Sequence, residues 1–401
     1  MMAGSMLGEP DTPRPLRIVH VLASLDPAQG GPPQVVLRLA EAQARLGAEV
    51  TVAHGRHGGD VEQVLRRAAE ALPGGPRARR VELPPLLGSR GRPHPIAAGT
   101  VDAVHLHMLW EPAIAAAAWR SRRLGIPYLV QPHGVLGPWA LAQKRLKKSI
   151  SMRLVHRRIL ERALFLQVLN EQERRGVELL GLPVPIEVVP NGVVVDEFER
   201  RVDRAVLERR VPALAGAPFV LFLSRLHPGK GLDLLAPAFA RVAAARPDVH
   251  LVVAGPDAGA EQSFRAAIAA TAAAPRVHVV GPLLGEEKLA ALGAAEVFVL
   301  PSRQEAFSVA LLEAMAAGRA VVATEGCNFP EISEAGAGLV VPSDERRLAE
   351  AIGRILADDT LRAAMGARGA AIVRKRYAWE VAARASLDAW RRRLAAAGVA
   401  R

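Results

Sequence analysis

The sequence predicts an α/β fold made of two doubly wound, Rossmann-like domains, each a parallel sheet flanked by helices. Short buried-strand patterns alternate with amphipathic helical patterns along most of the chain. This alternation starts twice, with a strand pattern at Leu16–Leu22 and another at Phe219–Ser224. A complete βαβ pattern between Val297 and Thr324 then indicates that the strands are parallel.

The composition indicates a globular chain with an anionic partner. Half of the 401 residues are hydrophobic, but no uncharged apolar run reaches the roughly 18 residues that a membrane-spanning helix needs. The net charge of +12 suits nucleic acid, lipid headgroups or a phosphorylated substrate. Only 4% of residues are aromatic, and no aromatic and basic platform for single-stranded nucleic acid is evident. A membrane surface or a phosphate is therefore favoured over nucleic acid.

The N-terminal residues and the single cysteine bear on the compartment. Residues 1–15 lack the basic and apolar regions of a secretory signal and are expected to form a disordered leader. Cys327, the only cysteine, cannot form an internal disulfide, which fits a reducing cytoplasm. A catalytic role for this thiol is not expected.

The first half of the chain contains two loops of interest. Gly30 and Gly31 follow the strand at 16–22 and precede a helix; they could approach a phosphate or form a simple turn. Helix 61–72, a short strand at 81 and a strand at 101–109 follow. His105 and His107 lie on one face of that last strand, but no third metal ligand is evident. A strand at 128–131 then leads to a loop with His133 and Gly134.

A basic helix follows the His133 loop, between residues 144 and 162. On a regular helix five cations fall within an arc of roughly 100°, opposite a partly apolar side. Such a helix suits anionic lipid or a phosphorylated acceptor, although a solvated helix face is equally compatible. The five cations are Lys144, Lys147, Lys148, Arg158 and Arg162.

The second half begins after a turn at Asn191–Gly192, and the domain boundary is expected near Phe198. A strand ending at Ser224 leads into a loop bracketed by Arg225 and Lys230. Two cations in a loop at the carboxyl end of a strand can neutralise a diphosphate. The loop lacks the Walker pattern of nucleoside triphosphatases. Further strand-to-loop turns are expected at Gly255 and Gly281.

The βαβ pattern at 297–324 places two glutamates beside a helix N-terminus. A helix is expected at 308–317, capped by Ser308 and ended by Gly318. The amides of Ala306, Phe307 and Ser308 would favour an anion such as a diphosphate at this sheet edge.

Glu305 precedes this helix and Glu313 lies within it. Because a carboxylate beside an anion site repels phosphate, Glu305 is expected to accept hydrogen bonds from sugar hydroxyls. If both residues were helical they would be roughly 12 Å apart along the axis, too far for a glycosidase carboxylate pair. A long ligand such as a nucleotide sugar fits this spacing, and so do two solvated surface glutamates.

This stretch resembles the E-x7-E motif of retaining glycosyltransferases of family 4, which have the GT-B fold with two Rossmann-like domains facing a cleft. The resemblance implies that Glu305 contacts the donor sugar and Glu313 the nucleotide ribose. The family often has glycines where this chain has Ala306 and Ser308.

Other motifs extend the resemblance over nearly the whole chain from Leu16. Arg225 and Lys230 resemble the R-x4-K pair that binds the donor diphosphate, and His133 resembles the histidine that hydrogen-bonds the donor sugar. The glycine loop, the interdomain turn and the two later turns resemble further donor-side elements. These positions are Gly30, Gly31, Asn191, Gly255 and Gly281.

The resemblance implies a retaining hexosyltransferase that uses a UDP- or GDP-linked sugar in cell-surface polysaccharide synthesis. We expect an acceptor-side domain at 16–198, a donor-binding domain at 199–375 and a helix at 376–401 that crosses back. The acceptor would be a glycan or a lipid-linked molecule, and the enzyme would lie in the cytoplasm, peripherally at the inner face of the plasma membrane. No metal or cofactor is expected, because Arg225, Lys230 and the helix N-terminus can supply the positive charge. A nucleotide-sugar epimerase and a basic nucleic-acid-binding protein remain the alternatives.

Overall fold

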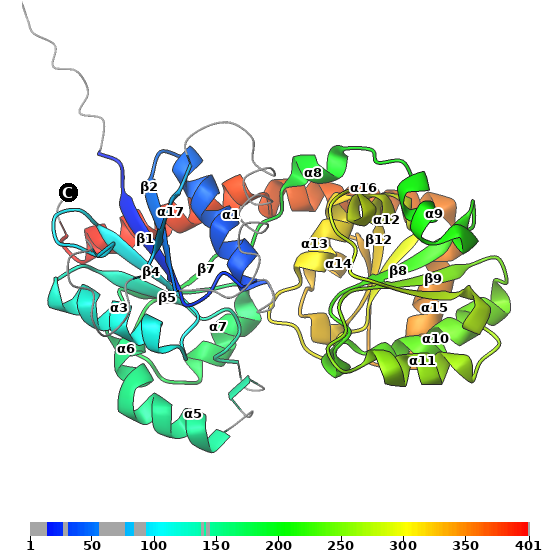
Figure 1. Cartoon of the computed structure of the whole chain (residues 1–401), viewed down its shortest axis with the longest axis horizontal. Helices are drawn as coiled ribbons and strands as arrows, with labels where there is room; N and C mark the ends of the chain where they lie inside the picture. Colours follow the sequence, from blue (N-terminus) through cyan, green and yellow to red (C-terminus); the bar gives the residue numbers. More distant parts are fainter. Residues whose placement is uncertain are drawn as a thin grey trace, which may run out of the picture.

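The computed structural model consists of two parallel sheets with helices on their faces, which confirms the predicted fold class (Figure 1). It describes residues 14–26, 31–55, 77–83, 94–137, 140–141 and 145–399. Most of the expected leader, the helix at 61–72, Gly30 and Lys144 lie outside the described residues. All strand pairs within the two sheets are parallel.

Within the described residues, the first sheet has seven strands in the order β3-β2-β1-β4-β5-β6-β7. Its order reverses between β1 and β4, and ligands of open α/β sheets bind at such a reversal. Its strands are β1 (Arg17–Leu22), β2 (Glu49–His54), β3 (Arg79–Glu82), β4 (Ala103–His107), β5 (Tyr128–Gln131), β6 (Phe165–Val168) and β7 (Ile186–Val188). The helices of this half include α1 (Pro32–Arg45), α3 (Pro112–Arg123), α5 (Arg145–Ser151), α6 (Arg157–Glu161) and α7 (Glu171–Glu178).

The second sheet has six strands in the order β10-β9-β8-β11-β12-β13, and it reverses between β8 and β11. Its strands are β8 (Phe219–Leu223), β9 (His250–Ala254), β10 (Val277–Gly281), β11 (Val297–Leu300), β12 (Ala320–Thr324) and β13 (Gly338–Val341). The surrounding helices include α9 (Ala205–Arg210), α10 (Leu232–Ala245), α11 (Glu261–Ala269), α12 (Glu286–Ala294), α13 (Val309–Ala316), α14 (Glu331–Glu334), α15 (Glu345–Leu356) and α16 (Asp359–Arg376).

The two halves are joined by a crossing of two chain segments. The first runs through Val193 into α8 (Val195–Glu199), and the second leads from Tyr377 into α17 (Trp379–Ala396). The Val193 amide donates to the Tyr377 carbonyl at 2.7 Å. Gly192 leaves room for Trp379, because a Cβ at residue 192 would lie 2.7 Å from the indole. From this crossing α17 returns to the first half and packs on α1 (Figure 1).

Candidate active site

Lys230 and Glu305 meet at the switch point of the second sheet. Lys230 follows β8 and Glu305 follows β11, and because these strands are neighbours their carboxyl ends bring the two loops together. The Lys230 ammonium donates to Oε1 of Glu305, and the Ser302 hydroxyl donates to the same oxygen at 2.6 Å. The Glu305 side chain is only 9% exposed. The sequence assigned separate ligands to these side chains, whereas the structure joins them in an ion pair.

The backbone of these loops is held by close packing. A Cβ on Gly231, whose φ is +71°, would lie 1.9 Å from the Pro301 carbonyl oxygen, so this loop requires glycine. Asn328 donates from its amide to the Glu305 carbonyl at 2.8 Å, and the Glu305 amide donates to Gly326 at 2.8 Å. Glu305 is therefore fixed by contacts from three different loops.

Three backbone amides at the start of α13 form no hydrogen bond with a described residue. The Ser308 hydroxyl caps the helix by accepting from the Leu311 amide at 3.3 Å, as the sequence predicted. By contrast, the amides of Ala306, Phe307 and Ser308 donate to no described residue. Arg225 is exposed and forms no ion pair within the described part of the chain. The loop thus keeps free donors for an anion, although Lys230 is engaged with Glu305.

The loop at His133 touches this donor-side loop from the other half of the chain. Gly134 has a φ of +83°, and a Cβ there would lie 2.3 Å from the Cβ of Ala306. The Asn170 side chain also reaches across and donates to the Ala306 carbonyl at 2.7 Å. The Gly134 amide donates to the buried carboxylate of Glu173 at 2.6 Å, which holds the loop in place. The structure therefore brings His133, Ala306 and Glu305 into one region.

His133 is held in an unusual backbone conformation beside a second histidine. Its φ is +55°, a left-handed value that is uncommon outside glycine. Its Nε2 lies 3.0 Å from Nδ1 of His107. Burial lowers the pKa of His133 to about 4, so the imidazole is neutral near pH 7.

Glu313 lies beside a separate small cavity where the two halves meet. Lys288 donates to its Oε1 at 2.8 Å. The cavity has a volume of about 150 Å³ and is lined by α1, α13, α17 and the connection before α8. Arg38 lies in its wall, 3.7 Å from Glu197, and its Nη1 is buried without a hydrogen-bond partner in the described residues. Gly31 lines the same cavity, which connects the glycine loop with Glu313.

The remaining predicted donor-side residues lie at the carboxyl ends of strands. Gly255 follows β9, and a Cβ there would lie 1.8 Å from the Ser224 carbonyl oxygen. Gly281 ends β10 with a φ of +70° and accepts a hydrogen bond from the Gly255 amide at 2.9 Å. Asn191 is 5% exposed beside the interdomain connection.

Comparison with known proteins identifies the family. A model described as "Glycosyl transferase 4-like domain" matches residues 30–192, and one described as "Glycosyl transferases group 1" matches residues 217–358. A phosphatidyl-myo-inositol mannosyltransferase of Mycobacterium leprae is 31% identical over 379 residues, covering 88% of this chain and 91% of that protein. The chain belongs to the GT-B glycosyltransferases of family 4. It is a hexosyltransferase.

Other relatives agree with this assignment. A Corynebacterium glutamicum protein named as a GDP-mannose-dependent mannosyltransferase is 33% identical over 218 residues, covering 52% of this chain and 56% of that protein. The structure of Anabaena HepE, solved with UDP and glucose, superposes with a TM-score of 0.73 at 20% identity, covering 94% of this chain and 99% of that chain. At that identity the superposition supports the fold alone.

The basic segment of the glycosyltransferase departs from the predicted single face. A π-helical turn at Met152–His156 separates α5 from α6, so the angle of 100° per residue does not hold along the segment. Lys148 is half-buried and donates to the Ala140 carbonyl at 2.5 Å. The prediction of five cations on one exposed face is therefore wrong for Lys148, while Lys147, Arg158 and Arg162 are exposed.

The sequence shows no third ligand beside His105 and His107, whereas the structure brings His20 next to them. His20 on β1 pairs in register with His105 on β4, and nitrogens of the three buried rings lie within 4.8 Å of one another. The sequence could not show this cluster because 85 residues separate the two strand positions. Lys288, Asn170 and Asn328 were likewise not predicted, since each contributes through a contact with another element of the fold. Ser302 was also missed, although it lies only three residues before its partner Glu305.

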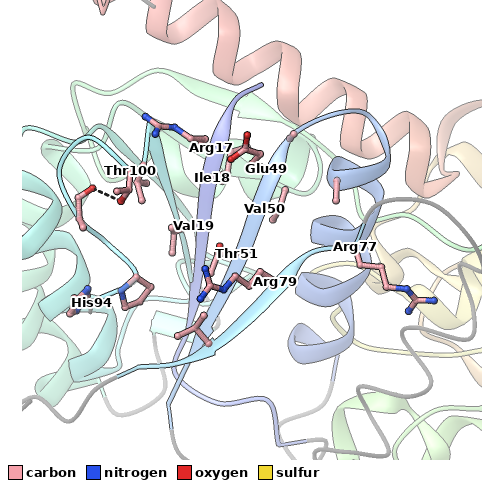
Figure 2. A pocket seen from close by; sticks show the side chains of 16 residues that line it. Arg17, Ile18, Val19, Glu49, Val50, Thr51, Arg77, Arg79, His94 and Thr100 are labelled. Atoms are coloured by element: carbon pink, nitrogen blue, oxygen red, sulfur yellow. Dashed lines mark hydrogen bonds between the residues drawn. The ribbon is translucent and has the colours of Figure 1, made fainter. Parts of the chain in front are cut away.

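One hollow of the glycosyltransferase is lined by residues other than those of this site (Figure 2). It has a volume of about 610 Å³ and lies over β1 and β2, with Val19 and Val50 on its floor. Arg17, Arg79 and His94 stand around it. None of the predicted donor-side residues lines this hollow.

Proposed function

We propose that the enzyme transfers a hexose, with retention of configuration, from a UDP- or GDP-linked donor to a lipid-linked acceptor at a membrane surface. The contact of the Glu305–Ser308 loop with the His133 loop carries this proposal. It places free amides, a cation and a carboxylate beside a neutral histidine. The amides and the cation suit the diphosphate of a nucleotide sugar, and the carboxylate and the histidine suit the hydroxyls of its sugar.

Each group has a distinct role in the proposed complex. The amides of Ala306, Phe307 and Ser308, with Arg225, receive the diphosphate and stabilise the charge that develops as the sugar leaves. Lys230 adds positive charge and orients Glu305, whose second carboxylate oxygen accepts from a sugar hydroxyl.

The same arrangement suggests a partner for the nucleotide ribose and a course for the transfer reaction. Glu313, held by Lys288, accepts from the ribose hydroxyls. No side chain is assigned as a nucleophile, and we propose, as the resemblance to the retaining enzymes of family 4 implies, that the acceptor attacks on the face from which the diphosphate departs. A bond forms between the acceptor oxygen and the anomeric carbon, the bond to the diphosphate breaks, and a diphosphate oxygen takes the acceptor proton.

The acceptor proposal rests on an exposed apolar stripe within the basic segment. Four large apolar side chains face solvent in α5 and the π-helical turn, although soluble surfaces rarely expose such a group together. Basic residues that include Arg145, Lys147 and Arg158 flank the stripe. The apolar residues, with their exposed fractions, are Leu146 (77%), Ile150 (51%), Leu154 (68%) and Val155 (44%).

This combination suits a helix that lies in the interface of an anionic bilayer. Among the described residues, no helix has the length and hydrophobicity needed to cross a membrane. We therefore infer peripheral attachment at the inner face of the plasma membrane. Two relatives are named for transfer to phosphatidylinositol or its mannoside, so phosphatidylinositol is the first acceptor to test.

Turnover of the donor tests this function and its proposed independence of metal. Purified enzyme is mixed with phosphatidylinositol micelles and UDP-glucose, UDP-galactose or GDP-mannose, and release of the nucleotide diphosphate is followed with and without EDTA. We expect at least one donor to be consumed at the same rate in both conditions, because protein cations and amides replace a divalent ion. Loss of activity in EDTA that magnesium or manganese restores would refute the metal independence.

Vesicle binding tests the membrane surface. A variant with Arg145, Lys147 and Arg158 changed to Gln should bind anionic vesicles at least tenfold more weakly than the wild type, since each cation contributes about 1 kcal/mol. Leu146→Ser with Leu154→Ser should also weaken binding, because it removes the apolar contact. The matched control changes Arg346, Arg347 and Arg354, three exposed cations of α15, to Gln. Equal binding of all variants, or of neutral and anionic vesicles, would favour a soluble acceptor.

A further inference from the structure

A row of polar side chains crosses the face of the first sheet that lies under α1 and α17. These side chains come from four neighbouring strands and are at most 1% exposed. They lie among apolar residues of α1 and α17, including Leu37 and Trp390. Because unpaired polar groups are costly in such surroundings, their partners decide what the row can do. The row consists of His20, His105, His107, Gln131 and Gln167.

Most of this row belongs to one continuous hydrogen-bond chain that ends at His133. Ser386 on α17 donates to Gln167 at 2.9 Å and accepts from the Gln43 amide of α1 at 3.1 Å. Gln43 Oε1 lies 2.7 Å from Nε2 of His20. His20 Nδ1 lies 2.8 Å from Nε2 of His107, whose Nδ1 lies 3.0 Å from Nε2 of His133. We call Gln43, His20 and His107, with Ser386, the histidine chain.

The donors and acceptors along the histidine chain can be assigned from the orientation of Gln43. Because the Gln43 amide nitrogen donates to Ser386, the Gln43 oxygen faces His20 and accepts from it. A neutral imidazole carries one N–H, so His20 must be protonated at Nε2 and must accept at Nδ1. His107 then donates from Nε2 and accepts at Nδ1, and His133 donates from Nε2. Burial lowers the pKa of each of these histidines, which keeps the rings neutral.

We propose that the histidine chain is a positioning device that holds His133 as its Nε2–H tautomer and leaves Nδ1 as an acceptor for a hydroxyl of the donor sugar. His133 Nδ1 forms no hydrogen bond with a described residue. The left-handed backbone of His133 is a second reason for an anchor, because such a conformation persists only where surrounding contacts hold it. The role toward the sugar rests on the proposed function, whereas the tautomer does not.

A metal ion is the competing use of the same rings. His105 Nδ1 is buried without a hydrogen-bond partner in the described residues, and its Nε2 lies 2.9 Å from Gln131. Two nitrogens that bind one tetrahedral zinc ion lie about 3.3 Å apart, given Zn–N distances of about 2.0 to 2.1 Å. The shorter 2.8 Å between His20 and His107 fits a shared proton instead. No carboxylate or thiolate joins the cluster among the described residues.

Nitrogen-15 NMR of the histidine rings tests this proposal without any substrate. Protein labelled only in histidine is compared with a His133→Gln variant, which assigns the His133 signals. We expect the wild type to show His133 protonated at Nε2. In Gln43→Leu, which removes the acceptor for His20, and in the milder Ser386→Ala, we expect a mixture of tautomers at His133. Gln43→Glu keeps an acceptor oxygen and should retain the wild-type tautomer.

Ser121→Ala is the matched control, because the Ser121 hydroxyl is also buried but donates to the Ala117 carbonyl of its own helix. It should leave the spectrum unchanged. Protonation of His133 at Nδ1 in the wild type, or an unchanged spectrum in both Gln43→Leu and Ser386→Ala, would overturn the proposal. One equivalent of tightly bound metal per chain, with removal shifting the His20 and His107 signals, would overturn it in favour of a metal site.

Kinetics connect the tautomer with the reaction. In Gln43→Leu we expect kcat/KM for the donor to fall about tenfold, with affinity for the free nucleotide diphosphate unchanged and activity restored in Gln43→Glu. A fall in nucleotide diphosphate affinity equal to the fall in kcat/KM would show general damage and contradict a positioning role. If the tautomer responds as expected but no nucleotide sugar is consumed, the proposed function fails while the histidine chain stands.

Discussion

Replacing Lys230 with alanine is expected to weaken binding of the nucleotide diphosphate by about 10- to 150-fold. The change removes a charge-assisted contact worth about 1.5 to 3 kcal/mol. It also leaves the nearly buried Glu305 carboxylate without its cation, next to the incoming diphosphate. Isothermal titration calorimetry with UDP and GDP measures the effect.

Two further variants separate the charge effect from damage to the fold. Arg241→Ala removes another ion pair, with Glu345, on the surface of α10, and it should leave affinity unchanged. Lys230→Ala combined with Glu305→Gln should recover part of the lost affinity, because it removes the unpaired carboxylate. Wild-type affinity in the single Lys230 variant would rule out Lys230 as a diphosphate ligand.

Acidification from pH 7 to pH 5 is expected to destabilise the fold strongly. Burial lowers the pKa of His20 and of His133 to about 4, and it lowers the pKa of His105 and His107 well below the usual 6.5. The unfolded chain therefore binds more protons than the folded chain between about pH 6.5 and 4. The stability that these histidines contribute is fully present above pH 6.5 and is lost as the pH falls through this window.

Urea unfolding at pH 7, 6 and 5 measures this loss. Near pH 5 each histidine that is protonated only on unfolding contributes a slope of up to about 1.4 kcal/mol per pH unit. We expect a combined slope that corresponds to at least two protons. A His20→Gln variant that still folds should show a shallower slope. A free energy of unfolding that is constant between pH 7 and 5 would contradict the burial of the histidine row.

Much of the fold and part of the site could be predicted because they depend on local patterns. The helix cap at Ser308 and the strand–loop–helix order around Glu305 follow from residues close together in the chain. The positions of Arg225, Lys230 and His133 after strands also place them at sheet edges, where parallel strands present their loops. The resemblance to family 4 added roles that spacing alone left open.

The rest could not be predicted because it depends on contacts between distant elements. Lys230 and Glu305 are 75 residues apart, and nothing in either loop shows that they pair. Ser386 reaches Gln43 across 343 residues only because α17 folds back onto α1. The π-helical turn at Met152–His156 likewise shifts the faces of a helix that a uniform angle per residue treats as regular.

The anomeric configuration of the product tests the central claim most directly. Proton NMR follows the reaction of an α-linked nucleotide hexose with phosphatidylinositol. The proton–proton coupling of the new anomeric signal gives its configuration, and for mannose the one-bond carbon–proton coupling is measured instead. We predict an α-linked product, because the proposed mechanism has the acceptor attack on the face of the sugar from which the diphosphate leaves. A β-linked product, or an intact donor in the presence of every nucleotide hexose tested, would contradict the account.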